Sequence, residues 1–304
     1  MKTFLLSLFL LFPFFAFPQS EELGAELKQL IRGKQATVGV AVIFNGSELI
    51  TINNIYRYPM LSTMKFHQAL AVLDYVNRHG ETLDKELLVS KDDLLPDTHS
   101  PMRDANPNGN FTITIGDLLK YSVIRSDNIA SDILARHIGG QRAVNDYIHK
   151  LGIRDVSITA TEAEMHEDVS NQYLNWTTPS AAALAIETFL QNNLFPEGYK
   201  LFLQRAMTES ETGKDKLLAG LPKKNVLLAH KTGSSDRNEY GVKVGDNDMG
   251  FVVLPDGQYY TIAVFIMNSR ETDEANARLM ADISRAVYRF FEKNHWATRY
   301  KIIQ

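Results

Sequence analysis

The sequence predicts an α/β (α+β) protein in which a five-stranded, mostly antiparallel sheet is flanked by helices and accompanied by an all-helical region. Three observations support this class. β-Rich segments occur only near the two ends of the chain, helical periodicity fills the middle, and a long amphipathic segment closes the sequence. With 304 residues, of which 44% are hydrophobic and 22% charged, the chain is long enough for two packed domains.

The composition excludes several functional classes. A formal net charge of -4 provides no basic surface for nucleic acid or for an anionic membrane. The absence of cysteine excludes disulfides, thiolate chemistry and Cys-type zinc sites. The eight histidines form no His-Glu-x-x-His motif, so we expect no metal and no cofactor. A monomer acting on a small molecule is the simplest expectation.

Residues 1–18 are predicted to be a signal peptide. Lys2 provides a positive start, and an almost wholly apolar run from Phe4 to Phe17 follows. The run is too short to span a bilayer comfortably, and cleavage is expected near Ala16–Ser20. The alternative is an uncleaved membrane anchor. A cysteine-free exported chain suits the bacterial periplasm, where export does not require disulfides.

The sheet domain is predicted to be discontinuous and to comprise residues 19–56 and 209–304. In the first part a helix over Ser20–Arg32 precedes a β-branched strand over Thr37–Phe44. The dipeptide Asn45-Gly46 then signals a hairpin, and the chain returns over Glu48–Asn53.

Residues 57–208 are predicted to form the all-helical domain. The periodicity and the capping signals give five helices, Phe66–Arg78, Thr114–Tyr121, Ile129–His137, Gln141–Leu151 and Pro179–Leu190, and a shorter pattern over Gly198–Met207. The segment Ser90–Asn110 has the composition of a loop, and the acidic segment Asp155–Asn175 shows no clean period.

The last third of the chain returns to strands, at Asn225–Gly233, Gly250–Leu254 and Tyr259–Met267, with a polar loop between the first two. A long amphipathic helix over Thr272–Lys293 then covers the sheet.

The segment around Ser62 is the first candidate for chemistry. Ser62 and Lys65 are three residues apart at the start of a buried helix, so they are expected to share a face of its first turn. A serine is a poor nucleophile until a neighbouring base takes its proton, and a lysine amine can be that base. The pattern Ser-x-x-Lys also arises by chance in a chain of this length.

Ser126-Asp127-Asn128 lies between two predicted helices. There Ser126 is placed to pass a proton, and Asn128 to hold an amide carbonyl. The competing interpretation is that Ser126 only caps the helix that follows.

Lys231-Thr232-Gly233-Ser234 lies at the end of an apolar strand. Here Lys231 supplies positive charge, the hydroxyl groups bind a carboxylate, and Gly233 permits close backbone approach. The competing interpretation is a polar strand end with a turn glycine.

These three motifs in this order resemble the signature of the class A serine β-lactamases, and the resemblance extends over essentially the whole mature chain. It implies the β-lactamase/transpeptidase-like fold and hydrolysis of the β-lactam amide bond of penicillins and cephalosporins, which confers resistance to these antibiotics. The resemblance implies that Ser62 is the acylated nucleophile and that Lys65 is its base or proton relay. It also implies that Ser126 donates a proton to the departing ring nitrogen.

The resemblance also assigns substrate contacts. Asn128 positions the substrate, and the carboxylate is held by the strand motif, namely Lys231, Thr232, Gly233, Ser234 and Ser235. The backbone N–H groups of Ser62 and Ser234 form the oxyanion hole.

A second base distinguishes a hydrolase of this family from an acyl-enzyme trap. The family places a glutamate on an Ω-loop, here at about residues 156–175, to activate the deacylating water. Glu162 matches by its spacing to Pro179, and Glu164 is the competing assignment. Whether acylation uses Lys65 or Glu162 through a water as base stays open.

Several positions depart from the family pattern. Ala163 stands where a proline is usual. His166 stands where an asparagine is usual, and this histidine resembles that of the extended-spectrum branch, which binds oxyimino-cephalosporins. Asn175 stands where the loop's aspartate is expected, and His99 where an aromatic residue usually lines the mouth. The arginine that often assists carboxylate binding has no clear match, and its candidates are Arg237 and Arg270.

Two other functions remain open. One is a penicillin-binding D,D-peptidase, for which Tyr173-Leu174-Asn175 would be the middle motif. The other is a non-catalytic periplasmic binding or sensor domain that kept the fold.

Overall fold

The computed structural model describes residues 18–44 and 46–302, so the predicted signal peptide and Asn45 of the predicted hairpin turn lie outside the described residues. Five strands form one sheet in the order β2-β1-β10-β9-β8, and every pairing in it is antiparallel. The strands are β1 (Thr37–Phe44), β2 (Glu48–Ile52), β8 (Leu227–Ser234), β9 (Lys243–Val253) and β10 (Tyr259–Ser269). The predicted sheet, built from both ends of the chain, is confirmed.

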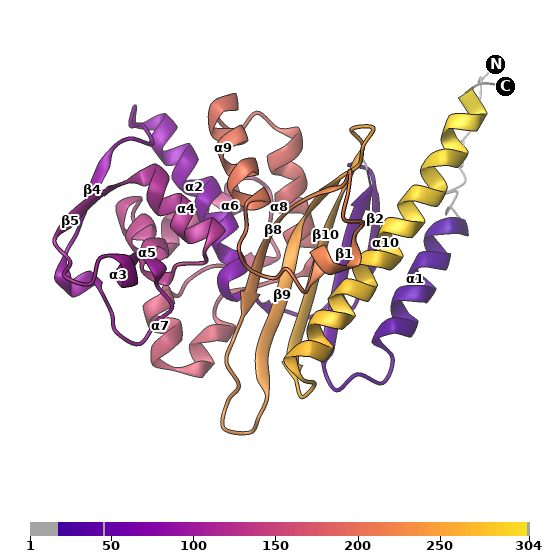
Figure 1. The fold of residues 1–304 in the computed structure, drawn as a ribbon, viewed down its shortest axis with the longest axis horizontal. Helices are drawn as coiled ribbons and strands as arrows, with labels where there is room; N and C mark the ends of the chain where they lie inside the picture. The colour runs from indigo at the N-terminus through magenta and orange to yellow at the C-terminus, as the bar shows by residue number, and fades with distance from the viewer. Residues whose placement is uncertain (1–17, 45, 303–304) are drawn as a thin grey trace, which may run out of the picture.

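Two helices cover one face of this sheet. They are α1 (Pro18–Ile31) and α10 (Asp273–Ile302), which lie side by side at the outer edge of the molecule (Figure 1). Strand β1 shows how the sheet separates two cores, because Val40 and Val42 join the core under α1 and α10, whereas Ala41 joins the other one. This alternation is the period-two pattern that the sequence of β1 predicted.

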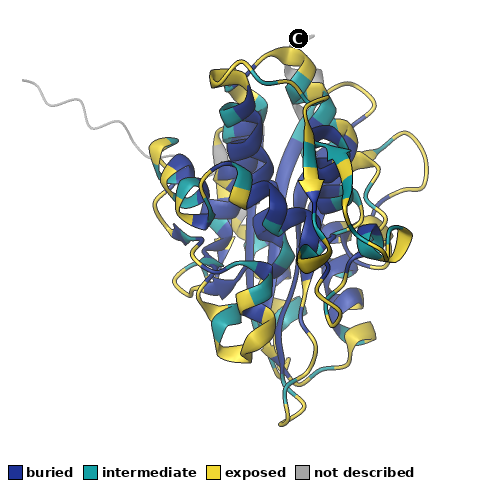
Figure 2. Cartoon of the chain, turned by 90° about the vertical axis from the view of Figure 1, so that its left-hand side faces the viewer, coloured by how far each residue is buried: buried dark blue, intermediate teal, exposed yellow. Residues whose placement is uncertain are grey.

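The helical region covers the opposite face. Its helices are α2 (Met64–Arg78), α3 (Pro101–Ala105), α4 (Ile115–Ile124), α5 (Asn128–His137), α6 (Gln141–Lys150), α7 (Glu162–Glu167), α8 (Pro179–Gln191) and α9 (Glu197–Thr208). Short 3₁₀ segments occur at η1 (Leu61–Thr63), η2 (Lys91–Asp93), η3 (Val169–Tyr173) and η4 (Leu217–Gly220). Seen from this side, buried residues occupy the centre and exposed residues the surrounding loops (Figure 2). Helix α2 is buried along most of its length.

The expectation that residues 57–208 are all-helical is wrong in detail. Strands β3 (Tyr58–Pro59), β6 (Val156–Ser157) and β7 (Trp176–Thr177) form a small sheet, and β4 (Glu86–Val89) pairs with β5 (Phe111–Thr114). Helix α3 also lies in the segment that was expected to be a loop. Strands β3, β6 and β7 are two residues long, which is too short for a hydrophobic period, so the sequence pattern could not predict them.

Strand β9 begins at Lys243, seven residues before the predicted start at Gly250 (250−243). Its first half is polar yet buried, because its side chains are used inside the protein. Asn247 Nδ2 donates to the carbonyl of Pro59 at 2.8 Å, and Asp248 Oδ1 lies 2.8 Å from His230 Nδ1. These contacts tie β9 to the segment before Ser62 and to β8.

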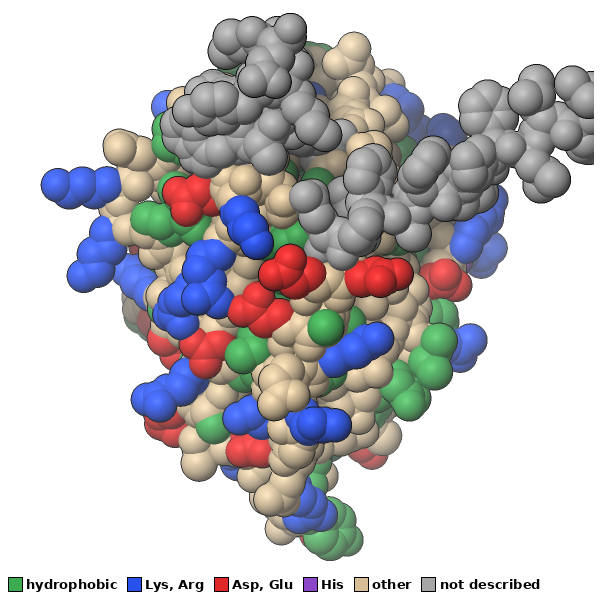
Figure 3. Space-filling view, turned by 90° about the vertical axis from the view of Figure 1, so that its right-hand side faces the viewer, with side chains coloured by type: hydrophobic (Ala, Val, Ile, Leu, Met, Phe, Trp, Pro, Cys, Tyr) green, Lys and Arg blue, Asp and Glu red, His purple; other side chains and the backbone are tan. Residues whose placement is uncertain are grey.

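The outer face over α1 and α10 carries Lys, Arg, Asp and Glu side chains that are interspersed (Figure 3). Arg289 on α10, for example, pairs with Glu26 on α1 at 2.7 Å. The described part of this face therefore presents no extended surface of one charge sign. None of the described helices is both long and apolar enough to cross a membrane.

Candidate active site

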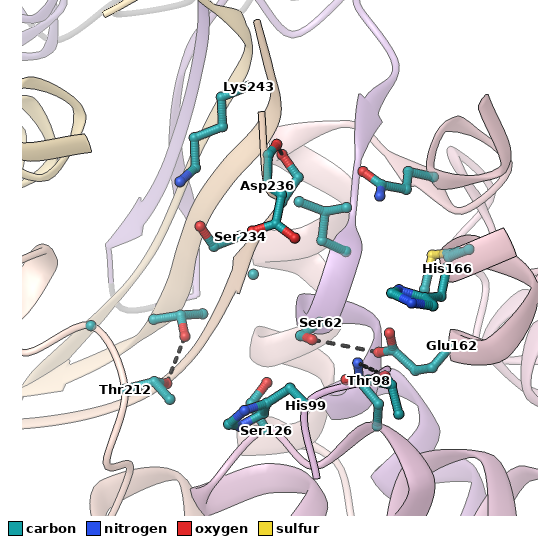
Figure 4. A pocket seen from close by; sticks show the side chains of 18 of the residues that line it. Ser62, Thr98, His99, Ser126, Glu162, His166, Thr212, Ser234, Asp236 and Lys243 are labelled. Carbon is teal, nitrogen blue, oxygen red and sulfur yellow. Dashed lines mark hydrogen bonds between the residues drawn. The ribbon is translucent and has the colours of Figure 1, made fainter. Parts of the chain in front are cut away.

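A pocket of about 670 Å³ lies where the helical region meets the end of β8. Its walls come from η1, the α4–α5 connection, α7 and the end of β8, so segments far apart in sequence converge there (Figure 4). Ten of the twelve residues predicted for the site line it directly: Ser62, His99, Ser126, Asn128, Glu162, His166, Thr232, Gly233, Ser234 and Ser235. The other two, Lys65 and Lys231, lie behind the pocket surface and contact it through their ammonium groups.

Ser62 lies in the 3₁₀ turn η1, which leads directly into α2. The sequence predicted that Ser62 lies in the first turn of the α-helix, whereas in the structure it lies in the 3₁₀ turn that precedes this helix. Leu61 before it has φ of 48°, a left-handed conformation that costs a non-glycine residue energy. Strand β8 passes close by, since a Cβ at Gly233 would lie 2.6 Å from the Met60 carbonyl oxygen. Only glycine fits this approach.

Lys65 is fully buried in the first turn of α2 and lies at the centre of the polar contacts. Its Nζ donates to Ser62 Oγ at 2.9 Å, to the Ser126 carbonyl at 2.8 Å and to Asn128 Oδ1 at 2.6 Å. Glu162 Oε1 lies 2.9 Å from the same Nζ. The lysine thus contacts the serine and the glutamate at once.

Ser126 lies in the α4–α5 connection, and the interpretation of Ser126 as a helix cap is wrong. Asp127 is the cap instead, and its carboxylate accepts the Ala130 N–H at 2.9 Å and the Met102 N–H at 2.7 Å. Ser126 has φ of 58°, and its Oγ accepts a hydrogen bond from Lys231 Nζ at 2.9 Å. The side chain therefore points to the pocket rather than to the helix.

Lys231 is fully buried on β8. Burial, and next the neighbouring Lys65 ammonium, hold the pKa of Lys231 well below its usual value. A lysine with a lowered pKa exchanges a proton more readily with the Ser126 hydroxyl that it contacts.

The end of β8 is arranged to present polar groups to the pocket. The Ser235 N–H donates to the Gly245 carbonyl on β9 at 3.0 Å, so by the alternation of strand N–H groups that of Ser234 points away from β9. The hydroxyl of Thr232 lies 2.6 Å from that of Thr212, and the Ser235 hydroxyl donates to the Asp236 carbonyl at 2.7 Å.

Glu162 and Glu164, the two competing assignments, differ in where they point. Glu162 is the first residue of α7, is buried, and has Oε1 3.4 Å from Ser62 Oγ (Figure 4). Glu164 turns back to its own helix, where Oε2 accepts the Thr161 N–H at 2.8 Å as part of a capping box. Of the two, only Glu162 lines the pocket.

Asp132 on α5 was missed by the sequence analysis. Its two carboxylate oxygens accept the N–H groups of Glu162 at 2.8 Å and Ala163 at 2.9 Å, which fixes the start of α7. Burial, and next the charge of Glu162, raise the pKa of Asp132 to about 6. The spacing Asn128-x-x-x-Asp132 puts both on one helix face, which is the only signal in the sequence that relates it to the site.

Asn175 closes the loop that carries α7. Its Oδ1 accepts the N–H groups of Thr159 at 2.7 Å and Ala160 at 2.9 Å, and its Nδ2 donates to the Ala160 carbonyl at 2.8 Å. Tyr173 of the same tripeptide is turned outward and donates to Asn268 Oδ1 at 2.6 Å. Neither residue lines the pocket, so Tyr173-Leu174-Asn175 does not act there as a catalytic motif.

The rim of the pocket contains the two candidate histidines and one of the candidate arginines. His99 and His166 lie at its two sides, and His99 Nε2 is 2.9 Å from the Arg125 carbonyl (Figure 4). Arg237 lines the rim but donates to Asp273 Oδ1 and to the Glu271 carbonyl, both at 2.6 Å. Arg270 does not line the pocket.

A further cation at the pocket was also missed. Lys216, in the segment before η4, lines the wall next to Thr232, and its Nζ pairs with Asp246 Oδ1 at 2.5 Å. Both side chains are buried. No sequence pattern joins positions 216 and 246, because the contact depends on how η4 packs beside β9.

The described residues contain no group of three or more His, Cys, Asp or Glu side chains that could hold a metal ion. The polar groups around Ser62 include its hydroxyl, the ammonium groups of Lys65 and Lys231, the Ser126 hydroxyl and the Glu162 carboxylate. This set suits nucleophilic acyl transfer with proton relay.

Comparisons with known proteins give a consistent result. A family profile described as "Beta-lactamase enzyme family" matches residues 22–291. A β-lactamase of Bacteroides uniformis is 45% identical over 271 residues, which cover 89% of this chain and 91% of the relative.

Two solved structures resemble most of the chain. A class A β-lactamase from Bacteroides cellulosilyticus superimposes with a TM-score of 0.87 and 44% identity, covering 90% of this chain and 99% of the other. The TLA-1 extended-spectrum β-lactamase superimposes with a TM-score of 0.88 and 40% identity over the same shares of the two chains.

Proposed function

Since the chain belongs to the class A β-lactamases, we propose that it hydrolyses the β-lactam amide bond of penicillins and cephalosporins through an acyl-enzyme on Ser62. The observation that carries this proposal is the placement of Ser62 Oγ 2.9 Å from Lys65 Nζ and 3.4 Å from Glu162 Oε1. One hydroxyl thus has a partner for acylation and a carboxylate for deacylation.

In acylation, Ser62 Oγ attacks the β-lactam carbonyl and loses its proton. Two routes for this proton fit the contacts. One leads to Lys65 as a neutral amine, and the other leads to Glu162 through a water. Negative charge that develops on the carbonyl oxygen is stabilised by the N–H groups of Ser62 and Ser234.

Opening of the ring requires a proton on the departing nitrogen. Ser126 donates this proton and is resupplied by Lys231, whose Nζ contacts its Oγ at 2.9 Å. The lowered pKa of Lys231 supports this relay because the buried ammonium releases a proton more easily than an exposed one.

Substrate binding uses the polar groups on both sides of Ser62. Asn128 holds the side-chain amide of the substrate, and the end of β8 holds its carboxylate through Thr232, Gly233, Ser234 and Ser235. His99 and His166 contact the substrate at the rim. Lys216 adds the positive charge for which the sequence offered only Arg237 and Arg270.

Deacylation completes the cycle. Glu162 removes a proton from a water that attacks the ester, Ser62 leaves with a proton, and the ring-opened acid is released. The fixed start of α7, held by Asp132, keeps this carboxylate against Ser62.

The relative with an extended-spectrum name supports a corresponding substrate range, which includes oxyimino-cephalosporins. His166, which lines the rim next to Glu162, is the residue of this chain assigned to that range.

We further propose that residues 1–18 direct export to the periplasm, where the mature chain acts as a monomer and confers β-lactam resistance. Residues 19–56 and 209–304 would form the sheet domain, and residues 57–208 the helical domain with the Ω-loop at about 156–175. Cell fractionation with a cytoplasmic marker and light scattering of the mature chain test these points.

The D,D-peptidase alternative predicts a long-lived adduct, because a peptidase acylates but deacylates slowly. The buried Glu162 next to Ser62 favours the hydrolase instead. A non-catalytic domain would have no reason to keep Ser62, Lys65 and Glu162 in mutual contact.

The test combines turnover of a chromogenic cephalosporin with intact-mass detection of adducts after mixing with penicillin. Wild type should turn over and show an adduct that disappears within minutes, whereas Ser62→Ala should do neither. Glu162→Gln should accumulate the adduct at Ser62 and lose at least about a hundredfold in turnover. Glu164→Gln is the matched control and should behave as wild type. An adduct that persists in wild type, or in Glu164→Gln only, contradicts the proposal.

A further inference from the structure

A second cavity of about 780 Å³ lies at the opposite end of β8 from the pocket just described. It is enclosed by one face of α9, the start of β8, the end of β9 and the β9–β10 turn, which lie near one another at the top of Figure 1. Leu227 at this cavity and Lys231 are four residues apart, or about 13 Å along an extended strand. The cavity is therefore a separate site.

Its walls are mainly apolar although they face solvent. Leu201 on α9 and Leu227 on β8 are 55% and 42% exposed, and buried Phe251 from β9 also lines the cavity. Large aliphatic side chains this exposed, placed together around a cavity, indicate a binding surface more often than chance. A volume in this range fits one small ligand.

The charge of the cavity has a single sign. Arg205 is the only charged side chain in the lining, and no described carboxylate lines it. Its side chain is 81% exposed, and the closest carboxylate pairing in the described structure is Glu209 at 4.0 Å. An exposed pair at this distance contributes little, so the guanidinium keeps most of its capacity to bind an anion.

A second cation lies at the edge of the cavity. Lys200 Nζ donates to the carbonyl of Leu190, which lines the cavity, at 2.6 Å. Among the described residues no carboxylate pairs with Lys200. Leu201, Arg205 and Thr208 are four and three residues apart on α9, so the apolar wall and the guanidinium share one helix face.

We propose that this cavity binds a single-chain anionic amphiphile, such as a medium-chain fatty acid. The alkyl chain lies against Leu201, Leu227 and Phe251, and the carboxylate pairs with Arg205. A cationic amphiphile is disfavoured because the lining offers it no counter-charge. The cavity's volume suits one chain rather than the two of a phospholipid.

The test measures binding of dodecanoate to the full-length mature protein by calorimetry, below the micelle concentration. We expect one saturable site per chain, and at least about fivefold weaker binding of dodecyltrimethylammonium. Arg205→Gln should weaken dodecanoate binding about two- to fivefold, as loss of an exposed ion pair would. Leu201→Ser should weaken it about tenfold, because apolar contact area is lost.

Two matched controls separate site from surface effects. Arg142 on α6 is 92% exposed and has the same i,i+4 pairing, with Asp146 at 3.7 Å, so Arg142→Gln should bind dodecanoate as wild type does. Leu184 on α8 is 44% exposed but does not line the cavity, so Leu184→Ser should also bind normally.

Several outcomes would overturn the proposal. Equal affinity of wild type and Leu201→Ser for dodecanoate would contradict binding in this cavity. Equal affinity of wild type for dodecanoate and dodecyltrimethylammonium would contradict a preference for anions. Competition with a β-lactam for the bound dodecanoate places it in the first pocket instead. Binding to anionic phospholipid vesicles but not to free dodecanoate identifies a membrane surface. A lower mass of Leu201→Ser than of wild type in light scattering identifies a contact between two copies of the chain.

Discussion

At the scale of single residues, the Lys216–Asp246 pair shows how a buried charge can serve both stability and binding. The two side chains form an ion pair, and of the two only Lys216 lines the pocket, where Thr232 also lies. Removing one partner of a buried pair leaves the other charge uncompensated, which costs about 3–5 kcal/mol. Removing both avoids most of that cost.

The first prediction uses this difference. Lys216→Met should lower the free energy of unfolding by about 3 kcal/mol and raise KM about tenfold, because Asp246 loses its partner and the substrate carboxylate loses a cation. The double variant Lys216→Met with Asp246→Asn should regain most of the stability but not the KM. Denaturant unfolding and steady-state kinetics measure the two effects. A double variant with wild-type KM would show that Lys216 has only a structural role.

The second prediction concerns pH and Asp132. Its pKa is about 6 in the folded protein and near 3.8 when unfolded, so the folded state binds the proton more tightly. As pH rises from about 4 to 6, the unfolded carboxyl ionises first, and stability should therefore fall by roughly 1–3 kcal/mol and then level off. Asp132→Asn should remove this fall.

Unfolding in denaturant at several pH values between 4 and 7 checks this expectation. The matched control is Asp84→Asn, at an exposed aspartate for which no bond is found in the described structure. An unchanged pH profile in Asp132→Asn would mean that the carboxyl is not the titrating group. In that variant one of the two N–H groups at the start of α7 also loses its acceptor, so slower deacylation is expected at every pH.

Among the residues, those that carry chemistry in fixed short motifs could be predicted, and those that support them could not. Ser62 and Lys65, or Lys231 and Thr232, are close in sequence, so their spacing relates them directly. Asp132 meets Glu162 across thirty positions (162−132), and only the fold brings them together. Such pairs leave no local pattern in a single sequence.

At the scale of elements, the loop with α7 is held by one amide side chain. Asn175 is fully buried and bonds to three backbone groups of residues 159 and 160. It stands where the family usually has an aspartate, and as an amide it both accepts and donates, which a carboxylate cannot. The loop is thereby closed without an ion pair at this position.

The third prediction follows from these bonds. Asn175→Ala should lower the free energy of unfolding by about 2–4 kcal/mol, because two buried N–H groups and a carbonyl lose their partner. Deacylation should slow more than acylation, since Glu162 lies on this loop. Stopped-flow kinetics should then show a larger burst. The control is Asn171→Ala, at a half-buried residue of η3 whose side-chain amide donates to the Glu164 carbonyl at 2.8 Å. Equal slowing of both steps would contradict this role.

The long helices and the apolar strands were predictable because their hydrophobic periods are strong. The start of β9 was not, because its buried face carries Asp246, Asn247 and Asp248, which bond to groups far away in sequence. The small strands β3, β6 and β7 are too short to show a period. In both cases the strands are determined by contacts that form only in the folded protein, and not by a local hydrophobic pattern.

At the scale of the whole molecule, the sheet separates two hydrophobic cores, and only one of them contains an element of the active site. The core under α1 and α10 contains Leu27, whereas the core on the other face contains α2, which carries Lys65. Stability should therefore be separable from catalysis by the choice of core.

The fourth prediction tests this separation. Leu27→Ala and Leu70→Ala each remove a fully buried leucine and should each cost about 2–5 kcal/mol. Only Leu70→Ala, on α2, should also lower kcat at 25 °C, because it loosens the helix that follows Ser62. Thermal unfolding and kcat are the measurements. A lower kcat in Leu27→Ala would show that the two cores are coupled across the sheet.

Strand β10 lies at the centre of the sheet and pairs with β1 from the opposite end of the sequence, Val40 opposite Val264. A ribosome must therefore have made nearly all of the polypeptide before β9 and β8 have a scaffold on which to align. A product cut short before β10 would contain every one of the three motifs and still lack the surface that sets Lys231 beside Ser126. A partial gene that ends before β10 would therefore encode all the signature residues and still confer no resistance.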